Sequence, residues 1–310
     1  MQKRNLMKIL KRIVISILIV LVLGLLGAYI YFDQKFTPEK NYLTVENESG
    51  NIPLTWPGDE KNVLLLPIHF PNDTVTYYLQ FDSGSPSTVF YSKAINNLKQ
   101  INRNHERAKT IFYIGKTKVM STKFQIIDIG NDANKNDNLK VIGTIGADIL
   151  ENRKTVINFK ENYIAFNLST EPVRFQEKLF DFKFKKRKII ILGLLNGTEE
   201  KFLFDSGTSA YELLTNKEVW EKLKFPNSKI NIEKSQSWDK VLTTYTTNCY
   251  QNIQFGDKKI KLANITYVEG FSQTQYSMMK FSGMTGMLGN KIFLNNCLYF
   301  DCTENKIGIE

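Results

Sequence analysis

The tripeptide Asp-Ser-Gly occurs twice in this chain, at residues 82–84 and 205–207, and each copy ends one apolar segment and precedes another. A single copy says little, because Asp, Ser and Gly are the ordinary residues of polar turns. Two copies that lie 123 residues apart in the same apolar frame are a much stronger constraint. They predict two related halves, each of which delivers a carboxylate from a buried strand into a tight turn.

Other landmarks recur in the same order around the two motifs. Each motif follows a predicted hairpin with alternating apolar residues, and Asn196-Gly197 is a strong turn signal in the second hairpin. After each motif come a predicted helix (residues 92–99 and 216–223), a strand pair broken by glycine, and an apolar-apolar-Gly motif ending at Gly146 or Gly289. The pattern predicts an all-β protein with an N-terminal lobe of residues 61–170 and a C-terminal lobe of residues 171–310.

A long apolar segment precedes these halves. Residues 13–32 contain no charged side chain, and as a helix they would span the hydrocarbon core of a bilayer, about 30 Å thick. A cleaved signal peptide is the alternative, although its apolar core is usually only about 7–15 residues long. We predict an uncleaved transmembrane signal anchor in the cell membrane. Residues 1–12 would then form a basic cytoplasmic tail, residues 33–60 a tether, and the remainder an extracytoplasmic domain.

The charge distribution argues against nucleic-acid binding. Five basic residues precede the apolar segment and no acidic residue occurs before Asp33, so residues 13–310 carry 36 basic and 31 acidic side chains. This excess is small and dispersed, whereas nucleic acids require a concentrated basic face. The one local run, Lys183–Lys188, is interpreted as a solvated segment.

Histidine and cysteine are scarce. His69 and His105 are the two histidines, and neither lies in a nucleophile motif, which argues against a Ser-His-Asp triad. No Cys and His residues have zinc-ligand spacing, so neither a metal nor another cofactor is expected. The three cysteines form either one disulfide or, as we favour, buried thiols; they are Cys249, Cys297 and Cys302.

Two carboxyl groups that meet at hydrogen-bonding distance share one proton, because both cannot ionise easily. One is then a base and the other an acid, and together they activate a water for attack on an amide carbonyl. Gly84 and Gly207 would permit the sharp turn after each aspartate. The hydroxyls of Ser85 and Thr208 are expected to hold the outer carboxylate oxygens.

These motifs resemble those of the pepsin-like (bilobal) aspartic proteases and, more distantly, a fused pair of retropepsin-like units. That family carries Asp-Thr/Ser-Gly and a downstream apolar-apolar-Gly motif in each lobe. The resemblance covers residues 61–310 and implies an acid-protease fold of two β-barrel-like lobes related by a pseudo-two-fold axis. It also implies Asp82 and Asp205 as the catalytic pair, supported by Ser83 and Ser206, and a peptide or protein as substrate.

Two features depart from the family pattern. Pro86 interrupts the polar run that usually follows the first motif. The family's flap, a hairpin that closes over the substrate with a tyrosine, belongs to the first lobe, where the available segment is short. Tyr113 is the flap candidate there, and Trp238, on a longer predicted hairpin of the second half, is the alternative cover.

The leading hypothesis is therefore a membrane-anchored aspartic endopeptidase with a monomeric catalytic domain. It is expected to cleave an extended peptide with apolar side chains on both sides of the scissile bond. The alternative is a catalytically inactive, protease-like β module that binds extracytoplasmic peptides or surface partners.

Overall fold

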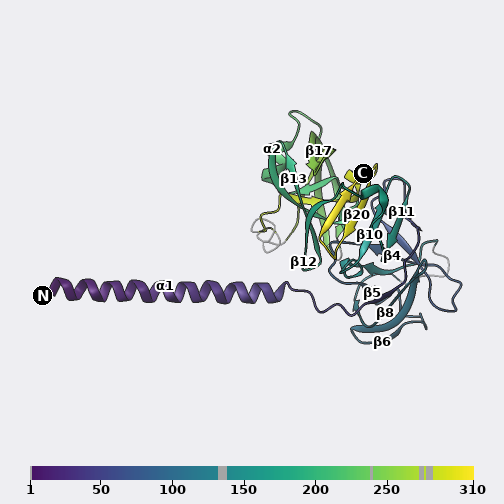
Figure 1. Ribbon diagram of the computed structural model, residues 1–310, viewed down its shortest axis with the longest axis horizontal. Helices are drawn as coiled ribbons and strands as arrows, with labels where there is room; N and C mark the ends of the chain where they lie inside the picture. Colours follow the sequence, from purple (N-terminus) through teal and green to yellow (C-terminus); the bar gives the residue numbers. More distant parts are fainter. Residues whose placement is uncertain (1, 132–137, 238–239, 272–275, 277–281) are drawn as a thin grey trace. The chain divides into compact units, whose positions relative to one another are not determined.

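A single helix, α1 (Gln2–Lys35), contains the apolar segment in the computed structural model of the chain (Figure 1). The structure describes residues 2–131, 138–237, 240–271, 276 and 282–310. Within Ile9–Lys35 the most apolar stretch of 18 residues has a mean hydropathy of 2.9, and none of its residues is buried. Its length and composition suffice to cross a membrane, a test that an N-terminal signal sequence also passes. Residues 1–40 and 41–310 form separate units.

The second unit is mostly β-structure. The strands of its first half are β1 (Thr44–Glu46), β2 (Ile52–Pro53), β3 (Leu65–Ile68), β4 (Tyr77–Phe81), β5 (Val89–Tyr91), β6 (Asn102–Asn104), β7 (Arg107–Ile114), β8 (Thr117–Ile127), β9 (Val141–Ile145), β10 (Lys154–Asn158) and β11 (Tyr163–Phe166). Those of its second half are β12 (Phe180–Lys185), β13 (Lys188–Leu195), β14 (Thr198–Phe204), β15 (Leu213–Thr215), β16 (Asn231–Ser237), β17 (Lys240–Phe255), β18 (Lys258–Glu269), β19 (Gly286–Leu288), β20 (Cys297–Asp301) and β21 (Lys306–Ile309). The helical elements are short: η1 (Ala147–Ile149), η2 (Val173–Phe175), η3 (Ser206–Thr208), α2 (Lys217–Leu223) and η4 (Asn290–Phe293).

In the described part of the chain the strands form two sheets. The eight-stranded sheet has the order β3-β4-β9-β5-β8-β7-β6, and β1 also pairs with β8. The thirteen-stranded sheet has the order β16-β17-β18-β15-β19-β14-β13-β12-β21-β20-β10-β11-β2. It contains strands of both halves because β10 pairs with β20 along its whole length. The two halves are therefore joined by continuous main-chain hydrogen bonding.

The strands around the two Asp-Ser-Gly motifs pair in the same order. In the first half β4 lies parallel to β9, β9 antiparallel to β5, and β5 parallel to β8. In the second half β14 lies parallel to β19, β19 antiparallel to β15, and β15 parallel to β18. Each motif consequently follows a strand held inside a sheet rather than at its edge.

Aromatic packing makes these strand ends rigid. Phe81 and Phe204, which directly precede the two aspartates, have no exposed surface. The Phe81 ring meets Phe166 edge-on with centroids 5.9 Å apart, and the Phe204 ring stacks on Phe300 at 5.5 Å. Full burial of each such side chain contributes about 1.5–3 kcal/mol, so moving either motif would disrupt a core.

Some expected elements differ in the structure. Residues 92–99 form successive turns instead of a helix, whereas α2 forms as expected and is capped by the Asn216 side chain, which accepts from the amide of Val219 at 2.9 Å. Within the expected tether, β1 and β2 pair with β8 and β11, so residues 41–60 belong to the folded unit. All three cysteines are buried free thiols, as favoured from the sequence.

Candidate active site

The two Asp-Ser-Gly loops are joined by reciprocal hydrogen bonds between their serines. The amide of Ser83 donates to Ser206 Oγ at 2.8 Å, and the amide of Ser206 donates to Ser83 Oγ at 2.9 Å. Each hydroxyl then donates across to the other half, Ser83 to the carbonyl of Phe204 at 3.2 Å and Ser206 to that of Phe81 at 3.0 Å. Both serines are buried, so these bonds fix the loops against each other without competition from water.

The carboxyl groups of Asp82 and Asp205 lie close enough for each to affect the pKa of the other. Each also lies against the glycine of the opposite motif. A methyl group at Gly84 would stand 2.6 Å from the carboxyl of Asp205, and one at Gly207 would stand 2.5 Å from that of Asp82. The glycines are therefore required for close approach of the two aspartates.

Main-chain amides hold the two carboxylates in place. Asp82 Oδ1 accepts from the amides of Gly84 at 2.9 Å and Ser85 at 3.1 Å, and Asp205 Oδ1 accepts from that of Gly207 at 2.9 Å. The hydroxyls expected to do this have other partners. Ser85 Oγ donates to the carbonyl of Ser87 at 3.0 Å, and Thr208 Oγ1 to the carbonyl of Asp205 at 2.8 Å. That expectation was wrong because the turn presents its amides, rather than its hydroxyls, to the carboxylates.

Burial is the main cause of the raised pKa values of both aspartates. Removal from water raises the pKa of Asp82, and the amides of Ser85 and Gly84 oppose this rise. Burial also raises the pKa of Asp205, and the neighbouring Asp82 carboxylate raises it further. Asp205 is 9% exposed, whereas Asp82 is partly buried and lines the adjoining cleft. The proton of the pair is therefore held more firmly by Asp205.

Gly146 and Gly289 pack against the main chain of the two Asp-Ser-Gly loops. A methyl group at Gly146 would lie 2.5 Å from the carbonyl oxygen of Ser87, and one at Gly289 would lie 2.1 Å from that of Thr208. The ends of β9 and β19 thus pack directly against the main chain that follows each aspartate. This close contact explains why glycine occupies both positions.

Asp148, two residues after Gly146, is a buried acidic group beneath the first motif, and no local sequence pattern indicated its burial. Asp148 is 5% exposed and accepts from both the amide and the hydroxyl of Thr88 at 2.7 Å. Burial raises its pKa to about 6, against the hydrogen bonds from Thr88 and the charge of Arg187. In the second half Asn290 directly follows Gly289 and is also buried, and its amide donates to the carbonyl of Ser206 at 3.2 Å.

Arg187 corrects the interpretation of the basic run as solvated. It is 5% exposed, pairs with Glu151 at 3.2 Å, and donates to the carbonyl of Pro86 at 3.1 Å. The two-residue turn Lys186-Arg187, in which both residues have positive φ, directs Arg187 toward the first half. Asn and Gly are the residues that usually signal such a turn, so the sequence offered no sign of it.

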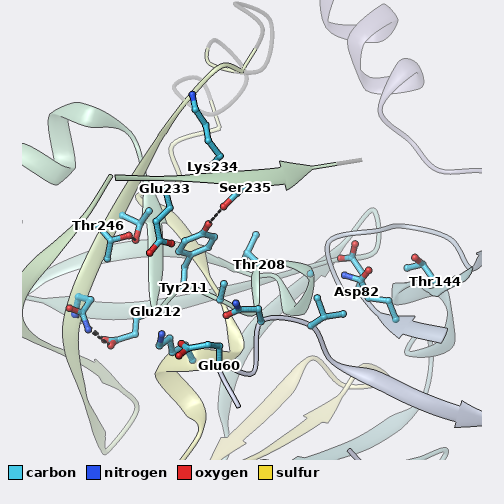
Figure 2. Close-up of a pocket in the computed structure, with 18 of the residues that line it drawn as sticks. Glu60, Asp82, Thr144, Thr208, Tyr211, Glu212, Glu233, Lys234, Ser235 and Thr246 are labelled. Carbon is cyan, nitrogen blue, oxygen red and sulfur yellow. Dashed lines mark hydrogen bonds between the residues drawn. The ribbon is translucent and has the colours of Figure 1, made fainter. Parts of the chain in front are cut away.

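Two cavities adjoin the aspartate pair. A large cleft of about 1110 Å³ contains Asp82 and extends across the second half, and a smaller pocket of about 350 Å³ contains both Asp82 and Asp205. Figure 2 shows Asp82 and Thr144 at one end of the large cleft and Glu233 and Thr246 at the other.

The hairpin β16–β17 forms one wall of this cleft, and four residues of β16 line it. Ser235 on β16 and Tyr211 near the second motif are joined by a 2.6 Å hydrogen bond between their hydroxyls (Figure 2). Trp238, the alternative cover, lies outside the described residues. Tyr113 exchanges main-chain hydrogen bonds with His69 and is not among the described residues that line either cavity.

The described residues contain no group of three or more His, Cys, Asp or Glu side chains that could hold a metal ion. No protein-family model matches this chain, and no curated protein matches it either.

Proposed function

We propose that this chain is a membrane-anchored aspartic endopeptidase similar to the pepsin-like family. The observation that carries the proposal is the close approach of the carboxyl groups of Asp82 and Asp205, each against the glycine of the opposite motif, at the edge of a cleft large enough for a peptide. A structural turn has no need of two buried carboxyl groups side by side, because burial disfavours their charged forms and costs stability.

The chemistry follows from how the pair holds its proton. Asp205 carries the proton and Asp82 is ionised, since the pKa of Asp205 is raised by both burial and its neighbour. Asp82 takes a proton from a water as the water oxygen attacks the amide carbon, and Asp205 donates its proton to the carbonyl oxygen. Asp82 then donates its proton to the nitrogen as the C–N bond breaks, and Asp205 takes a proton back from one hydroxyl of the tetrahedral intermediate, which forms the new carboxyl group and restores the pair. Because both pKa values are raised, the pH range in which the pair holds a single proton, and in which it is active, lies closer to neutral than for ordinary carboxyl groups.

We further propose that residues 61–170 and 171–310 are two lobes related by a pseudo-two-fold axis. The repeated pairing order around the motifs and the reciprocal serine bonds support this arrangement. The helix α1 would anchor the chain, with residues 1–12 in the cytoplasm and the catalytic unit, a monomer, on the extracytoplasmic side; the basic residues before the apolar segment support this orientation.

A cleavage assay tests the proposal. The full chain in detergent micelles is incubated with a peptide library from pH 3 to 8, beside Asp82→Asn and Asp205→Asn. Asp257→Asn, an exposed aspartate that lines neither cavity, is the matched control. Cleavage is expected with the wild type and the control and is expected to be lost in both site variants. Cleavage that persists in either site variant would exclude this mechanism.

An inactive peptide-binding module is the second candidate. The hairpin β6–β7 of the first half is short, with β6 only three residues long, so the first half contributes little to cover the aspartates. This alternative predicts peptide binding without cleavage by the wild type at every pH in the same assay.

A further inference from the structure

The two cavities that meet at Asp82 differ in size and in chemistry. Of the 23 described residues that line the large cleft, only Val63, Ile129 and Ala210 have apolar side chains, apart from two glycines. The small pocket is different, because the side chains of Pro86, Val89 and Ile127 form an apolar wall beside the aspartates. A substrate that crosses Asp82 would therefore meet different surroundings on its two sides.

The polar groups of the large cleft are partly free to bind a ligand. The carboxylates of Glu60 and Glu233 are exposed and have no hydrogen-bond or ion-pair partner within the described part of the chain. Other groups are arranged in pairs, such as Thr246 and Thr266, whose hydroxyls lie 2.8 Å apart. An apolar side chain placed here would strip water from these groups without replacing its hydrogen bonds, and such losses cost about 1–3 kcal/mol each.

The small pocket has fewer polar side chains, and apart from the aspartates these are Gln125, Ser85 and Ser87. The hydroxyl of Ser85 is already engaged by the carbonyl of Ser87, and Ser87 Oγ accepts from Arg187 at 3.4 Å. Val89 is 5% exposed and fixed in β5, and Ile127 is partly buried at the end of β8. Burial of an aliphatic side chain against this wall gains about 25 cal/mol per Å² of apolar surface removed from water.

We propose that the site selects an asymmetric peptide, with an apolar side chain on one side of the scissile bond and hydrogen-bonding side chains such as Ser, Thr, Asn or Gln on the other. The apolar residue occupies the small pocket, and the polar residues occupy the large cleft. This inference rests on the proposed function, since it assigns a substrate class to the same site. It replaces the expectation of apolar residues on both sides.

Binding to an inactive chain tests the inference separately from catalysis. Full-length Asp205→Asn in detergent micelles is titrated with four fluorescent octapeptides, and anisotropy is recorded. The peptides carry apolar residues on both halves, polar residues on both halves, and the two mixed orders. One mixed order is expected to bind at least tenfold more tightly than either uniform peptide. Equal or tighter binding of the wholly apolar peptide, or no saturable binding of any peptide, would overturn the inference. The same titrations are repeated with Asp82→Asn, and the same order of affinities in both variants shows that the preference does not come from a local change caused by Asp205→Asn.

Matched variants assign the two sides. Glu233→Leu is expected to reduce the preference of the large cleft for polar residues at least threefold, whereas Glu199→Leu, an exposed position that lines neither cavity, leaves it unchanged. Ile127→Gln is expected to weaken binding of the mixed peptide through its apolar half, and the exposed Ile111→Gln is its control. No effect of either site variant would contradict the assignment. Cleavage by the wild type is scored independently, so its absence would refute the activity without altering these affinities.

Discussion

Asp148 is predicted to make the stability of the folded unit depend on pH. Its pKa is about 6 in the folded protein and 3.8 in its ordinary state, because burial disfavours the charged form more than Thr88 and Arg187 favour it. Since the folded state binds this proton more tightly, the contribution to stability is complete below pH 3.8 and is lost as pH rises through 6. A difference of about two pKa units corresponds to about 3 kcal/mol.

The substitution Asp148→Asn removes this dependence while keeping the shape of the side chain. Its amide oxygen can accept from the Thr88 amide, and its NH₂ group can donate to the Thr88 hydroxyl. Relative to the wild type, the variant is expected to gain about 2–3 kcal/mol in the free energy of unfolding between pH 4 and pH 8. The aspartate pair contributes its own pH dependence, but it is common to both proteins and cancels in the difference.

Urea unfolding of the full chain in detergent micelles, followed by tryptophan fluorescence at pH 4, 6 and 8, measures this difference. Trp56 and Trp220 lie in the unit of residues 41–310, pack within it, and report on its unfolding. The opposite exchange, Asn290→Asp, is the control, and it is expected to destabilise at every pH because it removes two donated hydrogen bonds. A constant difference between wild type and Asp148→Asn from pH 4 to 8 would show that Asp148 titrates normally, and the reasoning would fail.

Three other predictions concern the loops and the thiols. Ser83→Ala leaves the buried amide of Ser206 without an acceptor and is expected to cost about 2–4 kcal/mol in urea unfolding, so a loss below about 1 kcal/mol would contradict the interlocked geometry. Gly84→Ala forces the carboxyl of Asp205 to move and is expected to cost more than about 2 kcal/mol, whereas Gly58→Ala, whose added methyl group meets nothing within 4 Å, stays within about 0.5 kcal/mol. Burial raises the pKa of all three cysteine thiols, so a thiol reagent at pH 8 is expected to label them only after denaturation, and rapid labelling of the native chain would refute this.

Much of the local structure was predictable from sequence patterns. Alternating apolar residues and the Asn196-Gly197 turn indicated the hairpin β13–β14, and the charge-free segment indicated a long apolar helix. The first predicted helix failed because residues 92–99 include Asn96 and Asn97, whose side chains favour turns over helical hydrogen bonding. Strands β1 and β2 were missed because each is very short and is stabilised by distant strands rather than by its own pattern.

The sequence alone determined that two aspartates follow equivalent buried strands, since apolar periodicity and turn chemistry are local properties of the chain. It also determined the glycines that allow those turns. Only the tertiary structure decided that Asp82 and Asp205 contact each other, that main-chain amides rather than hydroxyls hold them, and that Asp148 and Arg187 are buried beneath the first loop. The polar cleft could not be predicted from the sequence either, because its walls come from segments as far apart in the chain as Glu60 and Lys291. The burial and the pKa of a group depend on which distant segments exclude water from it, and local sequence patterns do not predict those segments.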